Sequence, residues 1–100
     1  MIEIRRTAVF LKWMRELRDV HARARIQIRV DRLSLGNPGD VMPVGEGVSE
    51  MRIDYGPGYR VYFAGRGKAV VVLLGGGDKQ TQHEDIARAR NLAKEWNDGA

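Results

Sequence analysis

The sequence contains no cysteine, only two histidines and no long apolar run. Without cysteine the chain can form neither a disulfide nor a thiolate centre, and His21 and His83 lie too far apart in the sequence to suggest a metal site. The longest uninterrupted apolar run, Ala69–Leu74, is too short to cross a bilayer. The glycine run Gly75–Gly77 also lacks the spacing of a nucleotide-binding loop. These absences predict a cytoplasmic protein with no metal, no small-molecule cofactor and no membrane contact.

The composition is that of a small basic globular protein. A chain of 100 residues, of which 43% are hydrophobic, is expected to form a single domain covering residues 1–100. Seventeen lysines and arginines against thirteen acidic residues leave a net charge of +4. Such a surface attracts phosphate backbones or an acidic protein partner. Taken alone, Arg23, Arg25 and Arg29 are interpreted as the solvated basic face of a helix.

The first part of the chain is predicted to contain a short strand and two helices. Ile2–Arg5 alternates apolar and polar residues like a strand, and Thr7 can cap a helix that ends near Asp19. The segment Val20–Leu35 contains neither glycine nor proline, so it is predicted to be helical although "RIQIRV" alone alternates like a strand. Its apolar residues at helical spacing are Ala22, Ile26, Val30 and Leu33. We expect the two helices to form a hairpin, which the turn "LGNPGD" closes.

The second part of the chain changes to the period of a strand. The segments predicted as strands are Val41–Val44, Val48–Tyr55, Tyr59–Ala64 and Lys68–Leu74. They are separated by "GEG", "GPG" and "GRG", each short enough for an antiparallel hairpin. The last strand contains "AVVVLL", which is apolar on both faces, so we expect it to lie centrally with other elements packed on each side.

A final helix is predicted after the last strand. The residues "TQHE", from Thr81 to Glu84, have the form of a capping box, and helical spacing continues to Trp96. The expected fold is therefore α+β: a twisted antiparallel sheet packed on an N-terminal helical hairpin, with a C-terminal helix. The layout is β-α-α-β-β-β-α.

Two longer stretches carry a resemblance to a known family. "GVSEMRIDYGPGYRVYF" and "VVVLLGGGDKQTQHEDIARA" resemble the RelE/ParE superfamily of bacterial toxins, most closely its addiction-module killer branch, which is related to the HigB-like toxins. The similarity covers almost the whole chain. It implies a RelE/ParE-like domain and a type II toxin–antitoxin system, in which a DNA-binding antitoxin, encoded by the adjacent gene, neutralises the toxin.

The resemblance implies more than one activity. RelE-like and HigB-like members cut messenger RNA on the ribosome without a metal, whereas ParE-like members inhibit DNA gyrase. We expect a ribosome-dependent, metal-independent mRNA endoribonuclease that inhibits translation. The alternatives are a non-catalytic toxin that inhibits gyrase or another target by binding, and a nucleic-acid-binding module without toxicity. The expected partners are mRNA on the ribosome and an acidic segment of the antitoxin, which would cover the arginine-rich sheet or the helical hairpin.

Metal-free RNA cleavage needs cations at the phosphate and groups that transfer protons. The resemblance places Arg60 at the position of a phosphate-binding arginine. The predicted catalytic residues are Arg60, Lys79 and His83. The predicted RNA contacts are Arg52, Tyr59, Gly76, Gly77 and Gln82. Glycines without side chains would let a nucleic-acid backbone approach the sheet, or they can be a permissive end of a strand.

The proton acceptor is the least determined part of this site. His83 ordinarily titrates near neutral pH, which suits a general base, but a histidine in a first helical turn is commonly a solvated surface residue. If His83 is not the acceptor, Glu50, Lys79 and Asp78 are the remaining candidates. Glu50 shares a strand face with Arg52 and can also serve only as its ion-pair partner. The sheet differs from the ribonuclease pattern in offering chiefly arginines where those enzymes often carry several lysines.

Overall fold

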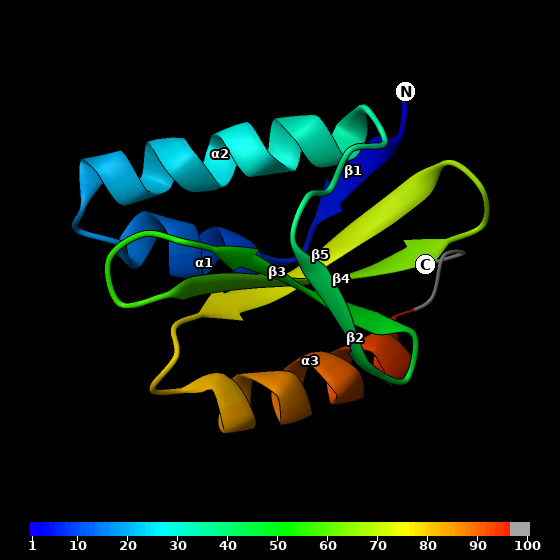
Figure 1. Ribbon diagram of the computed structural model, residues 1–100. Coiled ribbons are helices and arrows are strands. Elements are labelled where there is room, and N and C mark those ends of the chain that lie inside the picture. Colours follow the sequence, from blue (N-terminus) through cyan, green and yellow to red (C-terminus); the bar gives the residue numbers. More distant parts are fainter. Residues whose placement is uncertain (97–100) are drawn as a thin grey trace.

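The computed structural model describes residues 1–96, so the last four residues of the expected domain 1–100 lie outside the described residues. The elements follow in the order β1 (Glu3–Arg6), α1 (Ala8–Glu16), α2 (Val20–Ser34), β2 (Val41–Gly45), β3 (Val48–Ile53), β4 (Tyr59–Arg66), β5 (Val70–Gly77) and α3 (Gln82–Glu95) (Figure 1). The α+β class is confirmed. The layout β-α-α-β-β-β-α is one strand short, because all four segments predicted after the helical hairpin form strands.

The strands form one sheet in the order β1-β5-β4-β3-β2. Neighbours from β2 to β5 are antiparallel, as the short glycine turns predict. The expectation of an entirely antiparallel sheet is wrong, because β1 pairs parallel with β5 and the sheet is mixed. Two helices and three strands separate β1 from β5 in the chain, so no hairpin turn determines their relative direction.

The first two helices begin at side-chain caps. Thr7 Oγ1 accepts a hydrogen bond from the Phe10 amide at 3.2 Å, as expected. α1 ends at Glu16, and Asp19 does not end the first helix but caps the second, accepting from the amides of His21 and Ala22. The segment "RIQIRV" is helical, and the residues predicted to face the core are all buried: Ala22, Ile26, Val30 and Leu33. The prediction of a helix from the spacing of the apolar residues is thus confirmed for this segment, although its local alternation resembles a strand.

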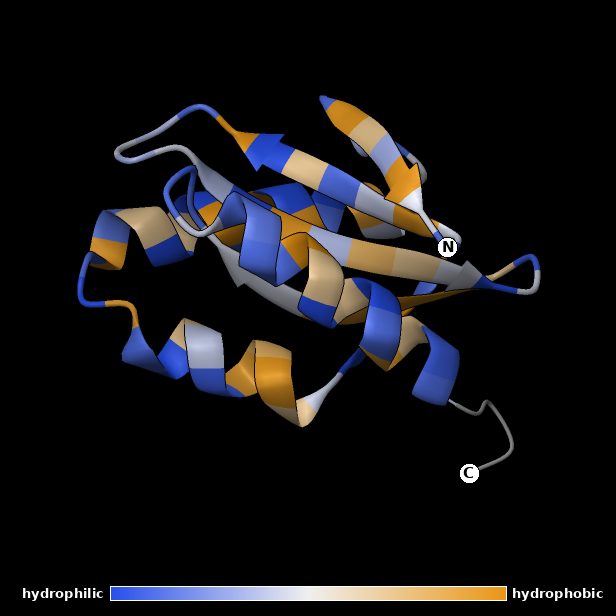
Figure 2. Cartoon of the chain, turned by 90° about the horizontal axis from the view of Figure 1, so that it is seen from below, coloured by the Kyte–Doolittle hydropathy of each residue, from blue (hydrophilic) through white to orange (hydrophobic). Residues whose placement is uncertain are grey.

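The sheet separates two apolar cores. On the face covered by α1 and α2, called the hairpin face, the core includes Phe10, Met51, Phe63 and Leu73. On the face covered by α3, called the α3 face, it includes Val72 and Leu74 with small residues of α3. Figure 2 shows polar and apolar residues alternating along the helices, as expected when one side of each helix packs on the sheet. The residues "AVVVLL" therefore do supply both cores, as predicted from their apolar composition.

The start of α3 differs from the expected capping box. Thr81 occupies the N-cap position, but its side chain makes no capping hydrogen bond. Its hydroxyl instead donates to the buried Asp85 carboxylate and accepts from the Asp78 amide. Asp78 accepts from the amides of Gln80 and Thr81, which fixes the turn before the helix. The polar residues of "DKQTQHED" thus stabilise the loop rather than a reciprocal cap. Within residues 1–96, none of the helices combines the length and the apolarity needed to cross a membrane.

Candidate functional site

Four of the predicted site residues meet at a shallow depression of about 310 Å³, beside the end of β3 and the start of β4. It is lined by Asp40, Arg52, Ile53, Asp54, Gly58, Tyr59, Arg60 and Lys79. Three cations and two carboxylates therefore face the same space. Gly76, Gly77, Gln82 and His83 are not among its lining residues.

Arg60 is the most firmly held of these cations. Its backbone lies opposite Arg52 on β3 and opposite Gly77 on β5. Only 12% of its side chain is exposed, and one terminal nitrogen donates to the Gly58 carbonyl oxygen at 2.8 Å. Its Nε lies 3.5 Å from a Glu50 oxygen but makes no hydrogen bond within the described residues. The guanidinium is thus fixed at the wall of the depression by the sheet and by the turn before β4.

Glu50 is a completely buried carboxylate beneath the two arginines, with 0% of its side chain exposed. It accepts hydrogen bonds from Arg52 Nε at 3.1 Å, from the Tyr62 hydroxyl at 3.0 Å and from Gln82 Nε2 at 2.9 Å. Because Arg52 and Arg60 are directly opposite on adjacent strands, their charges would repel without this anion. Glu50 therefore connects β3, β4 and the first residue of α3.

The electrostatics keep Glu50 ionised. Burial by itself would raise the pKa of its carboxyl, but hydrogen bonds from Gln82, Arg52 and Tyr62 and the charge of Arg60 outweigh burial and lower the pKa below 4.5. Burial and the Glu50 charge raise the pKa of the Tyr62 phenol well above its usual range, so the phenol stays a donor. The pairing of Glu50 with Arg52 was expected, whereas its bonds to Tyr62 and Gln82 were not.

Lys79 reaches the depression from the loop between β5 and α3. Its backbone amide donates to the Pro57 carbonyl oxygen at 3.4 Å, and its side chain is exposed. A Cβ placed on Gly58 would be 3.3 Å from an Arg60 nitrogen and 3.5 Å from the Lys79 Cβ. The glycine at this turn therefore lets Arg60 and Lys79 lie close together. The positive φ of Gly58, +80°, is a second reason for glycine there.

His83 lies on the exposed surface of the first turn of α3. Its neighbour Gln82 faces the sheet and binds Glu50, but no hydrogen bond or ion pair of the His83 side chain is found within residues 1–96. The structure therefore does not bring His83 together with Arg60 and Lys79. The amide of Gln82, predicted to contact RNA, is used inside the protein.

The predicted opening above the glycine run is filled by the protein's own side chains. A Cβ on Gly76 would overlap the indole ring of Trp13, and a Cβ on Gly77 would overlap the Asp85 carboxylate. Gly75 and Gly77 are buried. The glycines are thus required for internal packing, and the expected reason for assigning Gly76 and Gly77 to RNA contacts is wrong. Composition alone gives no signal that a residue on α1 occupies this space.

Tyr59 lies at the junction of two environments. Its ring packs edge-on against Trp13, with centroids 6.4 Å apart, on the hairpin face, and it also lines the depression. Tyr62 points to the α3 face and is completely buried. The two tyrosines therefore do point to opposite faces, and one of them is core, as strand alternation predicts.

The depression can bind an anion and can also accept a proton. Arg52, Arg60 and Lys79 supply cations, while Asp40 and Asp54 supply carboxylates on the same lining. Asp54 was predicted to lie on the strand Val48–Tyr55, beside Arg52 on the same face, but β3 ends at Ile53. The role of Asp40 was missed because periodicity does not place a loop residue. Within residues 1–96, no three or more histidine, cysteine, aspartate or glutamate side chains are grouped to hold a metal ion.

Comparison with known proteins identifies a relative but no described activity. No family model matches the sequence. A protein of Haemophilus influenzae, described as an uncharacterized protein, is 46% identical over 94 residues. The matched part is 94% of this chain and 95% of that protein. Because this identity extends over nearly the whole of both chains, the chain belongs to the same family as the Haemophilus influenzae protein.

Proposed function

We propose that the protein is the toxin of a type II toxin–antitoxin system, in the addiction-module killer branch of the RelE/ParE superfamily. It is proposed to cleave mRNA on the ribosome without a metal ion and so to inhibit translation in the cytoplasm. Its proposed partners are mRNA on the ribosome and a DNA-binding antitoxin encoded by the adjacent gene. The observation that carries the proposal is the meeting of Arg52, Arg60 and Lys79 in one open depression.

The proposed chemistry uses the substrate's own 2′-hydroxyl as nucleophile. Its oxygen attacks the adjacent phosphorus, the bond from phosphorus to the 5′-oxygen breaks, and a 2′,3′-cyclic phosphate and a 5′-hydroxyl result. Arg60 suits the non-bridging oxygens of the phosphate, because its guanidinium is held by the sheet and the Gly58 carbonyl. Lys79 has an exposed ammonium group, which suits donation of the proton that the leaving 5′-oxygen takes up as its bond to phosphorus breaks.

The geometry favours an aspartate of the depression as the acceptor of the 2′-hydroxyl proton. Glu50 is sealed from solvent and occupied by donors, so it cannot reach a substrate hydroxyl. Asp54 and Asp40 are both exposed and line the depression, whereas His83 does not line it. Asp54 directly follows β3, the strand that carries Arg52, whereas Asp40 lies in the loop before β2. We therefore assign proton acceptance to Asp54 and keep His83, predicted from the sequence, as the alternative. Glu50 acts by positioning the arginines.

A single-turnover cleavage assay on programmed ribosomes tests these roles. Arg60→Ala should slow cleavage by about a hundredfold or more, because one fixed cation is lost from the transition state. Asp54→Asn should cause a comparable loss, because an amide cannot accept the proton, while His83→Gln should leave the rate unchanged. Lys68→Ala, in the exposed turn before β5, is the matched control for loss of one surface cation.

Two outcomes would change the proposal. A His83→Gln protein with a large loss of rate would return proton acceptance to the histidine. The second candidate is a ParE-type toxin that acts by binding gyrase or another target. It would be supported if mRNA stays intact with the wild-type protein and all variants while expression of the protein still stops growth. The position of His83 outside the depression is the observation in favour of that candidate. Cleavage products should carry 2′,3′-cyclic phosphate ends, and a 2′-deoxy nucleotide at the cut site should abolish cleavage.

A further inference from the structure

Met42 is an exposed methionine whose sulfur contacts a cation of the candidate site. It lies on β2, at the edge of the sheet, and 45% of the residue is exposed. Arg52 Nη2 donates a hydrogen bond to its Sδ at 3.2 Å. Within the described part of the chain, neither of the two apolar cores includes Met42. Core packing therefore does not explain a methionine at this position.

The register of the sheet brings Met42 and Arg52 together. Met42 is directly opposite Glu50 on β3, and Arg52 is two residues further along that strand, so the side chains of Glu50 and Arg52 lie on one face. Arg52 Nε donates to Glu50 at 3.1 Å, while Nη2 donates to the methionine sulfur. The guanidinium thus lies between a buried carboxylate and an exposed thioether, and Arg52 also lines the depression.

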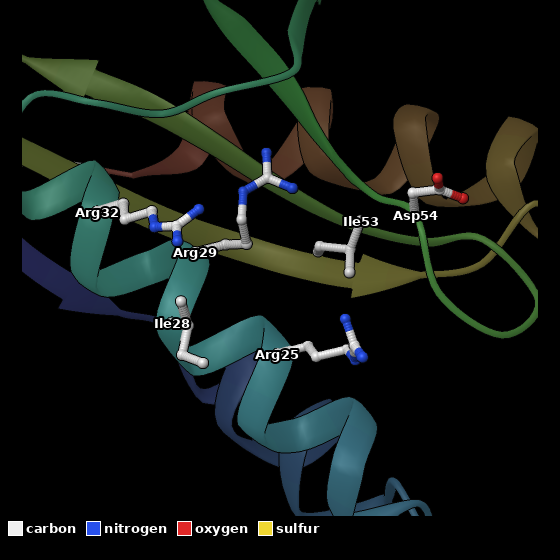
Figure 3. A pocket seen from close by; sticks show the side chains of 6 residues that line it. All are labelled: Arg25, Ile28, Arg29, Arg32, Ile53 and Asp54. Carbon is white, nitrogen blue, oxygen red and sulfur yellow. The ribbon is translucent and has the colours of Figure 1, made fainter.

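The main chain of Arg52 is held from α2 by Arg29. Arg29 lines a hollow of about 320 Å³ between α2 and the end of β3 (Figure 3). Its guanidinium donates to the carbonyl oxygens of Arg52 at 2.5 Å and of Pro38 at 2.9 Å, so the expectation that Arg29 belongs to a solvated helix face is wrong. The Arg52 amide donates to the Asp40 carbonyl oxygen at 2.9 Å. Because this main chain is fixed, a chemical change at Met42 acts on the side chain of Arg52.

A thioether and a sulfoxide differ as hydrogen-bond acceptors. The thioether sulfur is a weak acceptor, so a phosphate oxygen that enters the depression can displace it from Arg52 Nη2. A methionine sulfoxide is polar, and its oxygen accepts a charge-assisted hydrogen bond from a guanidinium. Oxidation of Met42 therefore occupies a donor of Arg52 that the unmodified residue leaves available to an anion.

From this contact, we propose that Met42 is a site of reversible oxidation by hydrogen peroxide, and that its sulfoxide weakens anion binding by Arg52. The sulfur lone pair attacks one peroxide oxygen and the O–O bond breaks. The departing hydroxide takes the proton of the transferred oxygen, so a sulfoxide and one water form, and sulfur loses the two electrons that the peroxide gains. A methionine sulfoxide reductase with a dithiol reverses the change, since the oxygen leaves as water and the dithiol becomes a disulfide.

The other three methionines provide internal controls for the oxidation itself. Met51 is completely buried, Met14 is half-buried against the hairpin core, and Met1 is 97% exposed. Dilute hydrogen peroxide should therefore oxidise Met42 at a rate similar to that of Met1 and at least about tenfold faster than Met51. Peptide mapping by tandem mass spectrometry measures the four rates. Oxidation of Met42 as slow as that of Met51 would overturn the proposal.

The response of Arg52 is measured by NMR of protein that carries isotope-labelled arginine. Oxidation should shift the Nε–H signal of Arg52, because the acceptor beside its guanidinium changes. The Met42→Leu protein has no sulfur at this position and should show no such shift after the same treatment. An Arg52 signal that stays in place once Met42 of the wild type is fully oxidised excludes the proposed coupling.

Binding of a 2′-O-methyl oligouridine, followed by fluorescence anisotropy, measures the effect on the candidate site. Peroxide should weaken binding by the wild type and by Met1→Leu about threefold to tenfold, and should leave binding by Met42→Leu unchanged. Methionine sulfoxide reductase should restore the wild-type affinity. Met42→Gln carries a permanent oxygen acceptor in its amide and should bind weakly without peroxide.

The effect on RNA rests on the proposed function, whereas the oxidation of Met42 and its effect on Arg52 do not. If the unoxidised protein binds oligouridine and oxidation leaves the affinity unchanged, the proposal for Met42 is wrong. If the unoxidised protein does not bind oligouridine, the proposed function fails. Peptide mapping and the Arg52 signal then still decide whether Met42 is the modification site.

Discussion

The two faces of the sheet are stabilised in different ways. On the hairpin face, apolar side chains of α1 and α2 pack on apolar residues of β3, β4 and β5. On the α3 face, a similar apolar cluster adjoins a buried ionic group, in which Glu50 joins Arg52, Arg60, Tyr62 and Gln82. Apolar packing depends little on the exact orientation of the side chains, whereas each hydrogen bond to a buried carboxylate depends on the angle between donor and acceptor.

This difference separates stability from the geometry of the candidate site. A change in the hairpin core lowers the free energy of unfolding but leaves the donors around Glu50 in place in the molecules that remain folded. A change in the Glu50 group also alters the placement of Arg52 and Arg60, which line the depression. A buried ion pair is weak evidence for stability by itself, so positioning is the better explanation for a charge at this place.

The largest effect on stability is expected from the hairpin core. Phe10 is 2% exposed, and its ring lies 6.0 Å from that of Trp13. Phe10→Ala should lower the free energy of unfolding by about 3–5 kcal/mol, because the substitution leaves a cavity as well as removing apolar contacts. Urea unfolding measures this loss. Leu11→Ala, at an exposed site of the same helix, should lower the free energy of unfolding by less than about 1 kcal/mol.

A similar loss for Phe10→Ala and Leu11→Ala would show that the hairpin face is not the main apolar core. In the folded fraction, Phe10→Ala should retain the affinity of the candidate site for oligouridine. Loss of both stability and affinity would break the separation between the two faces.

A smaller effect on stability, dependent on pH, is expected from the α3 face. Glu50→Gln replaces a carboxylate that accepts hydrogen bonds from Arg52, Tyr62 and Gln82. The substitution should lower the free energy of unfolding by about 2–3 kcal/mol at neutral pH. The pKa of Glu50 is lower in the folded than in the unfolded protein, so ionised Glu50 stabilises the fold above about pH 4.5. This stabilisation is lost as the pH falls through the lower, folded pKa.

The difference between wild type and Glu50→Gln should therefore shrink as the pH falls below about 4.5, because the wild-type carboxyl also becomes neutral. Urea unfolding at several pH values between about 3 and 7 measures it. Gln82→Ala tests positioning separately, since it removes only the bond from α3 to Glu50. A constant difference between wild type and Glu50→Gln over this range would exclude the ionised state of Glu50 as the source of the stability.

Periodicity predicted most of the fold. The spacing of Ala22, Ile26 and Val30 located the buried side of α2, and the glycine turns located the antiparallel strands. The parallel pairing of β1 with β5 could not be predicted, because it joins segments at opposite ends of the chain. Long-range pairing leaves no local pattern in the sequence.

The candidate site could be predicted only in part. Arg52 and Arg60 were located correctly beside each other, since both lie on predicted neighbouring strands. The alternation of β3 could have identified Glu50 as a buried charge, because it shares a face with the buried Val48. The placement of Asp54 and Lys79 in the depression depends on loop geometry, and the orientation of His83 depends on the exact start of α3. Neither is determined by spacing alone.

The smallest of these effects on stability is expected at the glycine run, where Gly76 lies against Trp13 of α1 and Gly77 lies against Asp85 of α3. Gly76→Ala should lower the free energy of unfolding by about 2 kcal/mol, because its Cβ would overlap the Trp13 ring and the ring must shift. Gly65→Ala is the matched control: this strand glycine has no atom within 4 Å of a Cβ, and it should be neutral or slightly stabilising. In a Trp13→Ala background the cost of Gly76→Ala should nearly disappear, since the overlapping ring is absent. A double-mutant cycle by urea unfolding measures this coupling. If Gly76→Ala leaves stability unchanged but abolishes oligouridine binding, the glycine is needed for a nucleic-acid contact, and internal packing does not explain it.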